Sequence, residues 1–188
     1  RLDTHFQALT QLGGNVELGE NFHLRSQGRL KAAKIFLDEQ SVTGTENAVM
    51  AAVLAEGHTV LENAACEPHV QGLCRLLCEM GAKIEGIGTH ILEIEGVQNL
   101  GGADHTIGSD YLEIGSFIGI SAVCGGPISI ENSNPGDLRM IQLVYRKLGI
   151  EFEIGEDNVV HVPAGQELVI RNELLGQIPQ ISDSPWPQ

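Results

Sequence analysis

The sequence repeats itself at an interval of about 68 residues. Three segments, residues 12–17, 80–85 and 148–153, share an apolar residue, a glycine and a short alternation of apolar and polar residues. Their glycines, Gly13, Gly81 and Gly149, are 68 residues apart at both steps. Each glycine follows a helical pattern and precedes a strand pattern, so we expect it to end a helix in the left-handed conformation. A chain with this period is built from repeated supersecondary units.

The other half of the unit repeats as well. An apolar run, a glycine and an Asn occur at residues 48–63 and again at residues 118–132, and Gly57 and Gly126 are 69 residues apart. In each copy a strand leads to a first helix, a second strand follows the glycine, a second helix opens beside a proline (Pro68 or Pro135), and a hairpin closes the unit. The predicted unit is therefore βαβαββ, and the fold class is α/β.

This unit divides the chain into two predicted domains. The first domain, residues 1–98, holds a partial unit (1–28) and a full unit (29–98). The second, residues 99–188, holds a full unit (102–164) and a partial unit (165–188), with the glycine-containing segment 96–102 as the linker. Residues 1–12 read as a second helix and residues 168–171 as a first strand, so we expect a central fragment of a longer protein.

The charge balance limits the classes of ligand. Lys and Arg number 11 against 25 Asp and Glu, a net charge of −14, which argues against a general nucleic-acid binder. The first 36 residues carry five basic and three acidic side chains, so we expect any small anionic ligand near this third of the chain. The longest apolar run, residues 48–55, is far shorter than the roughly 20 residues of a membrane-spanning helix. With no secretory signal at the start, we expect a cytoplasmic location and no membrane partner.

The cysteines suggest no redox motif. Cys66, Cys74, Cys78 and Cys124 form no CxxC pair, which suits a reducing compartment. Cys74 and Cys78 are four residues apart on a predicted helix and could reach a metal ion together with His69. We prefer the interpretation that these are thiols packed as small hydrophobic groups, and we expect no metal site.

Several stretches resemble the enolpyruvyl transferase family, in the branch that acts on UDP-N-acetylglucosamine. They are residues 3–5, 41–47, 54–68, 80–84 and 94–97, and the run at 54–68 is the most specific. The resemblance extends along nearly the whole chain. It implies βαβαββ units arranged as an inside-out α/β barrel, incomplete in this chain, with the active site between two domains.

The resemblance also implies a reaction and its substrates. Enolpyruvyl would pass from phosphoenolpyruvate to the 3-hydroxyl of UDP-N-acetylglucosamine by addition and elimination, the first committed step of peptidoglycan synthesis, which serves cell shape and division. No metal or organic cofactor is expected. The family's catalytic Cys or Asp would lie before Arg1 and its general-base Asp after Gln188, with Asp183 in the stretch that precedes it. We therefore expect no catalytic residue in this chain and no turnover by the chain alone.

The turn before the predicted helix 48–56 is the first candidate site. Thr43 and Glu46 have the spacing of a capping box, so we expect a helix N-terminus there, with backbone N–H groups facing an anion. Spacing alone favours an ordinary cap, whereas the resemblance implies UDP-N-acetylglucosamine binding. The residues of this half of the site are Glu39, Gln40, Ser41, Val42 and Thr43. The family often has a lysine at the position of Glu39, so phosphate contacts would rest on hydroxyl and N–H groups, with help from Arg1.

The first residues of the chain complete that site. The resemblance places Arg1, Leu2, Asp3 and Thr4 at the end of the family's nucleotide loop, where an Asp accepts a hydrogen bond from the uracil imide. Spacing alone makes Asp3 the N-cap of a helix over residues 4–12, and both roles are compatible. His5, on the same turn, is either a structural or a catalytic histidine.

Asp110 is a weaker candidate. It precedes the first helix of the next unit, with Glu113 three residues later, so the preferred interpretation is a capping box. The resemblance implies an acid here that faces the cleft between domains.

Two other functions stay open. The related enzyme of the shikimate pathway shares the repeat but lacks the run at residues 62–68. A non-catalytic nucleotide-sugar-binding or interaction module would explain why Glu39 stands where the family often has a lysine. In either case, a chain that ends within a unit exposes strand edges, through which it could self-associate.

Overall fold

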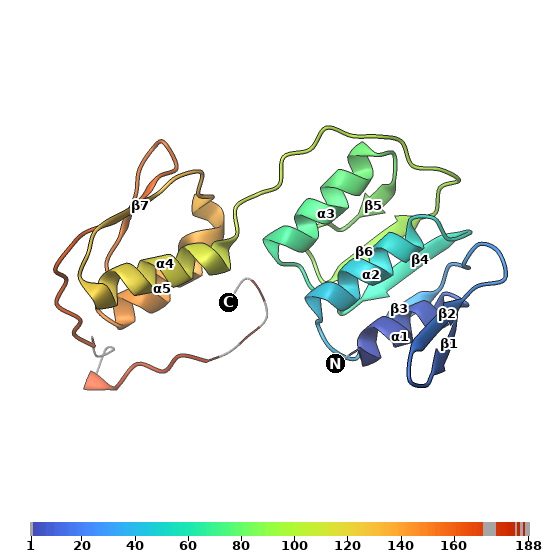
Figure 1. Ribbon diagram of the computed structural model, residues 1–188, viewed down its shortest axis with the longest axis horizontal. Coiled ribbons are helices and arrows are strands. Elements are labelled where there is room, and N and C mark those ends of the chain that lie inside the picture. The colour runs from blue at the N-terminus through green and yellow to red at the C-terminus, as the bar shows by residue number, and fades with distance from the viewer. Residues whose placement is uncertain (1, 171–175, 183, 185, 187–188) are drawn as a thin grey trace. The chain divides into compact units, whose positions relative to one another are not determined.

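The computed structural model describes residues 2–170, 176–182, 184 and 186. The chain divides into two compact units, Arg1–Ile107 and Gly108–Gln188, which are described here one at a time (Figure 1). Among the described residues, no helix is long and apolar enough to cross a membrane.

The first unit begins with a helix and a hairpin and continues with a complete repeat. Helix α1 (Asp3–Gln11) precedes the antiparallel pair β1 (Asn15–Leu18) and β2 (Phe22–Arg25). The repeat then consists of β3 (Lys34–Phe36), α2 (Val42–Ala52), β4 (His58–Glu62), α3 (Pro68–Glu79), β5 (Lys83–Glu85) and β6 (Ile91–Glu95). This is the predicted βαβαββ order. Its sheet has the strand order β3-β4-β6-β5, in which only β3 and β4 pair in parallel.

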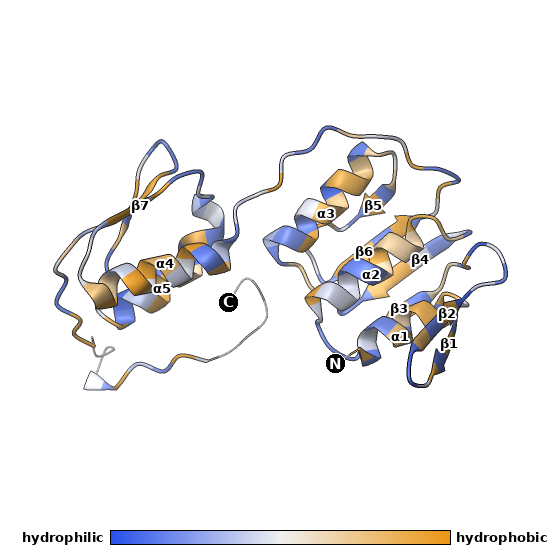
Figure 2. Ribbon diagram, viewed as in Figure 1, coloured by the Kyte–Doolittle hydropathy of each residue, from blue (hydrophilic) through white to orange (hydrophobic). Residues whose placement is uncertain are grey.

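One face of this sheet carries the core. Residues alternate along each strand, so Ile35, Leu61 and Ile94 point to the same side, where α2 and α3 cover them (Figure 1). Apolar positions of α3 and β6, orange in Figure 2, contribute to the same cluster. Full burial of a Leu or Ile side chain is worth about 1.5–3 kcal/mol, so this layer fixes the positions of both helices.

The repeated turn residues adopt repeated conformations. Gly13, Gly81 and Gly149 have φ of +88°, +104° and +80°, which confirms the predicted left-handed helix ends. Asn63 and Asn132, which are 69 residues apart, have φ of +59° and +57°. The sequence repeat is therefore also a repeat of backbone conformation.

The second unit is a shortened copy. It contains α4 (Tyr111–Cys124), β7 (Ile128–Ile130), the 3-10 turn η1 (Pro135–Leu138), α5 (Arg139–Lys147), β8 (Glu153–Ile154) and β9 (Val160–Val162). The strands are antiparallel in the order β7-β9-β8, and their core includes Ile118, Phe152 and Val160.

Two expected strands are not formed in the described part of the chain. Residues 102–110 form no strand ahead of α4, because they include two glycines and a single large apolar residue, Ile107, which is 89% exposed. A strand there would have no apolar side to bury beside β7. Residues 168–170 also form no strand, and Arg171 lies outside the described residues.

Helices α2 and α4 are counterparts with different surroundings. Their N-caps, Ser41 and Asp110, are 69 residues apart. Helix α1 packs against α2, where Ala48 is only 1% exposed. The α4 counterparts of Ala48 and Ala51 are Phe117 and Ile120, which are 49% and 56% exposed.

Candidate functional site

Helix α1 holds the loop between β3 and α2. The hydroxyl of Thr4, 2% exposed, donates to Asp38 Oδ1 at 2.7 Å and lies 3.2 Å from Glu39 Oε1. Gln7 Nε2 donates to the carbonyl of Phe36 at 2.9 Å, and Gln7 Oε1 accepts from the N–H of Asp38 at 3.2 Å. The structure therefore brings Thr4 and Glu39, two of the predicted site residues, into contact.

Helix α2 starts at Val42, with Ser41 as its N-cap. Ser41 is extended (φ −73°, ψ 124°), its Oγ accepts from the N–H of Gly44 at 3.1 Å, and its carbonyl accepts from the N–H of Thr45 at 2.9 Å. The predicted capping box of Thr43 and Glu46 is wrong, because the cap lies two residues earlier. The N–H groups of Val42 and Thr43 are in the helix's first turn, which offers them no intrahelical acceptor. They form the positive end of the α2 dipole.

His5 connects α1 to the first turns of α2. Its Nε2 lies 3.3 Å from Thr43 Oγ1 and its Nδ1 lies 2.6 Å from Asn47 Nδ2. Gly44 permits this close approach, since a Cβ there would lie 2.9 Å from Thr4 Cγ2. The sequence analysis did not single out Asn47, although it follows Thr43 by four residues and so shares its helix face.

Asp3 is not the N-cap of α1. The helix begins at Asp3, and the N-cap position belongs to Leu2, whose side chain makes no capping hydrogen bond. Asp3 therefore lies in the first turn, where a carboxylate interacts favourably with the helix dipole. With Gln7 and Asp38 it lines an open depression of about 550 Å³. Arg1 lies outside the described residues.

Gln40 is turned toward the start of β6. Its Nε2 lies 2.8 Å from Nδ1 of His90, and the same ring nitrogen lies 3.0 Å from the carbonyl oxygen of Ala64. The loop is thus held by α1 on one side and by the hairpin on the other. Between these two attachments, Ser41 and Val42 are half-buried and Thr43 is exposed.

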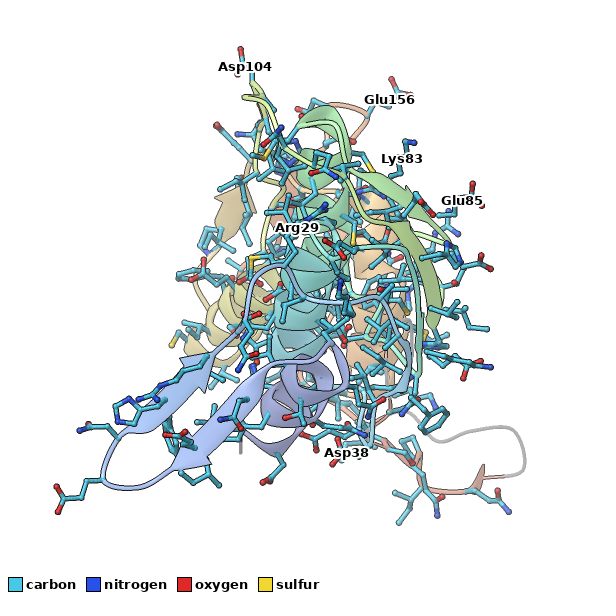
Figure 3. All side chains as sticks on the ribbon, turned by 90° about the vertical axis from the view of Figure 1, so that its right-hand side faces the viewer. Arg29, Asp38, Lys83, Glu85, Asp104 and Glu156 are labelled. Carbon is cyan, nitrogen blue, oxygen red and sulfur yellow. The ribbon has the colours of Figure 1, made fainter. Side chains whose placement is uncertain are left out.

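The described basic residues of the first 36 do not gather at this site. Lys31 pairs with Glu56, Lys34 pairs with Glu62 at 3.0 Å, and Arg25 lies 3.9 Å from Glu17. Arg29 donates to the carbonyls of Leu54, Ala55 and Val97, so it lies at the opposite end of α2 from Asp38 (Figure 3). Among the described residues, the polar groups at the start of α2 are therefore N–H groups and hydroxyls, with no Lys or Arg side chain from the first 36 residues beside them.

Asp110 is the N-cap of α4, as predicted. Its Oδ1 accepts from the N–H of Leu112 at 2.8 Å and from that of Glu113 at 3.2 Å. It belongs to the second unit, while the residues around Ser41 belong to the first.

The cysteines of the first unit behave as apolar groups. Burial raises the pKa of Cys74 to about 11, and burial, with a smaller contribution from Glu67, also raises the pKa of Cys66. Cys74 belongs to the core cluster of the first unit. Within the described ranges, no group of three or more His, Cys, Asp or Glu side chains comes together as a metal site would require.

The chain is similar to known proteins along its whole length. A family model described as EPSP synthase (3-phosphoshikimate 1-carboxyvinyltransferase) matches residues 2–181. The UDP-N-acetylglucosamine 1-carboxyvinyltransferase of Treponema denticola is 52% identical over 187 residues, and that of Borreliella burgdorferi is 49% identical. Both matches cover 100% of this chain, but only 43% and 44% of the relatives, so the chain spans less than half their length.

Solved structures support the fold. The enolpyruvyl transferase NikO from Streptomyces tendae matches with a TM-score of 0.72 at 21% identity, over 89% of this chain and 43% of that one. EPSP synthase from Acinetobacter baumannii matches with a TM-score of 0.68 at 16% identity, over 95% of this chain and 42% of that one.

Proposed function

Because the chain belongs to the EPSP synthase (3-phosphoshikimate 1-carboxyvinyltransferase) family, we propose that it is part of an enzyme that transfers enolpyruvyl from phosphoenolpyruvate to the 3-hydroxyl of UDP-N-acetylglucosamine. The observation that carries this proposal is 52% identity along the whole chain to a UDP-N-acetylglucosamine 1-carboxyvinyltransferase. The reaction would take place in the cytoplasm and begin peptidoglycan synthesis.

The role of this chain is to bind the nucleotide sugar. The N-terminus of α1 and the loop before α2 supply Leu2, Asp3 and Thr4 on one side and residues 39–43 on the other. Contact between Thr4 and the loop supports a single site made of both segments. In this site, Asp3 accepts from the uracil imide.

The diphosphate binds at the start of α2. The N–H groups of Val42 and Thr43 lie at the positive end of the helix dipole. The Ser41 oxygen already accepts from Gly44, so its hydroxyl proton is free to be donated to a phosphate oxygen. Glu39 stands where the family often has a lysine, but it does not take over the contact to phosphate, because its carboxylate lies against Thr4.

A shikimate-type substrate is less well supported. Eight curated relatives at 45–52% identity are named UDP-N-acetylglucosamine 1-carboxyvinyltransferase, whereas the Acinetobacter EPSP synthase is 16% identical. A non-catalytic interaction module of the same fold is favoured by one observation. The loop before α2 presents two carboxylates, Asp38 and Glu39, and no described Lys or Arg side chain.

Self-association through strand edges is also a proposal; in the described structure β2 pairs only with β1.

A binding experiment tests the proposed site directly. We would titrate the chain with UDP-N-acetylglucosamine by ligand-observed NMR, with N-acetylglucosamine as the ligand control. The matched variants are Asp3→Ala in the site and Asp104→Ala on an exposed loop of the same unit. Loss of a charge-assisted hydrogen bond costs about 1.5–3 kcal/mol, so Asp3→Ala is expected to weaken binding at least tenfold while Asp104→Ala leaves it unchanged. Binding that is absent at millimolar ligand, or equal in the two variants, contradicts the proposal.

A further inference from the structure

The contacts of His5 determine where its ring proton lies. The amide nitrogen of Asn47 is a hydrogen-bond donor and lies 2.6 Å from Nδ1, so Nδ1 of the neutral ring is the acceptor. The proton is then on Nε2, which faces Thr43 Oγ1 at 3.3 Å. His5 therefore donates to the hydroxyl oxygen of Thr43.

This donation decides what the Thr43 hydroxyl can do. Its oxygen accepts from His5, so its own proton is available to a different group. Thr43 is exposed, whereas His5 and Asn47 are half-buried between the two helices. The backbone N–H of Thr43 also lies in the first turn of α2, which offers it no acceptor. One residue thus presents two donors toward solvent at the N-terminus of the helix.

We infer that His5 is a positioning residue that orients the Thr43 hydroxyl as a phosphate donor in the nucleotide-sugar site. The inference rests on the proposed function and deepens it. His5 itself touches no ligand in this arrangement. It acts through Thr43, while Asn47 fixes the ring tautomer.

The close approach of α1 and α2 makes the arrangement specific. Thr43 and Asn47 are four residues apart, so they lie on one face of α2 and bracket the ring. Gly44 lies between them and lacks the Cβ that would come within 2.9 Å of Thr4. The His5 ring is therefore held from both sides by partners on a single helix.

Replacing His5 with Gln or Asn tests the roles of its two ring nitrogens one at a time. In His5→Gln the amide nitrogen reaches the position of Nε2, so the donor to Thr43 is retained. In His5→Asn the amide reaches only the position of Nδ1, so that donor is lost. Thr43→Val removes the hydroxyl and nearly preserves the shape of the side chain.

The readout is the ratio of affinities for UDP and uridine, measured by ligand-observed NMR. We expect His5→Asn and Thr43→Val each to lower the ratio about five- to tenfold, the double variant to lower it no further than Thr43→Val, and His5→Gln to retain it. A purely structural role would weaken UDP and uridine equally. Thr43→Ser, which keeps the hydroxyl, is expected to retain the ratio. Because Thr43 is exposed, Thr43→Val tests the donor even where a His5 variant does not fold.

The outcomes separate this inference from the proposed function. If the wild-type chain binds UDP more tightly than uridine and His5→Asn leaves this ratio unchanged, the positioning role is overturned and the proposed function stands. An unchanged ratio in Thr43→Val overturns it as well. If the wild-type chain binds neither UDP nor UDP-N-acetylglucosamine, both the positioning role and the proposed function are overturned.

Discussion

Replacing Gly44 with Ala tests how closely α1 approaches α2. Alanine is favoured over glycine in a helix by about 1 kcal/mol. At Gly44, however, the new Cβ would lie 2.9 Å from Thr4 Cγ2 and 3.0 Å from Ser41 Oγ. Rotation of Thr4 would relieve the first contact, but it would also break the 2.7 Å hydrogen bond to Asp38. Overpacking costs about 1–3 kcal/mol, so we expect Gly44→Ala to destabilise the first unit by about 1 kcal/mol net.

Gly72 provides the matched control. It lies within α3 of the same unit, and a Cβ there would meet nothing within 4 Å. Gly72→Ala is expected to stabilise the unit by roughly 0.5–1 kcal/mol. The two variants should therefore differ by about 2 kcal/mol, or roughly 10 °C in the unfolding temperature of the first unit.

The assay is thermal unfolding followed by far-ultraviolet circular dichroism. Both glycines belong to the first unit, so the same transition reports both substitutions. If Gly44→Ala raises the unfolding temperature as much as Gly72→Ala does, the close approach of the two helices is refuted. The contact of His5 with Thr43 and Asn47 would then lose its structural basis.

Three further outcomes are expected. Asp110→Ala removes the acceptor for two N–H groups of α4 and should lower the stability of the second unit by about 1 kcal/mol, while Asp110→Asn, another good cap, should lose much less; urea unfolding measures both. Under native conditions a thiol reagent should modify exposed Cys124 well before buried Cys74, as peptide mass spectrometry would show, and equal rates would contradict the burial of Cys74. The pKa of Cys74 rises from 9.0 to about 11 on folding, so its contribution to stability is complete below pH 9 and is lost as pH rises through 11; Cys74→Ala should flatten that part of the pH dependence of the urea midpoint.

Local rules anticipated much of the first unit. Gly13, Gly81 and Gly149 could be predicted as left-handed helix ends because only the absence of a Cβ makes that conformation inexpensive. The strands of the unit could be predicted because their apolar residues alternate and face one core. Each of these features depends on residues within a few positions of one another.

Features that depend on distant partners could not be predicted in the same way. The start of α2 was misplaced for a local reason: Ser41 caps the N–H of Gly44, and a glycine there has no side chain with which to complete the capping box. The other differences involve distant partners. The net positive charge of the first 36 residues indicated an anion site, yet Lys31 and Lys34 are paired with Glu56 and Glu62, which are far away in sequence. The contact of His5 with Asn47 spans 42 positions and becomes visible only when the two helices are packed.

The first helix of the repeat occurs twice among the described residues. Helix α1 packs against α2, whereas the counterpart residues of α4, Phe117 and Ile120, are exposed there. Val49 in α2 and Ile118 in α4 are both fully buried on the sheet side, while Ala48 is covered and its counterpart Phe117 is exposed. Amide hydrogen exchange at these matched positions therefore compares local opening of one helical element with and without a covering helix. We expect slower exchange at Val49 than at Ile118. The ratio of their two protection factors would then measure how much a neighbouring helix contributes to the local stability of the repeat.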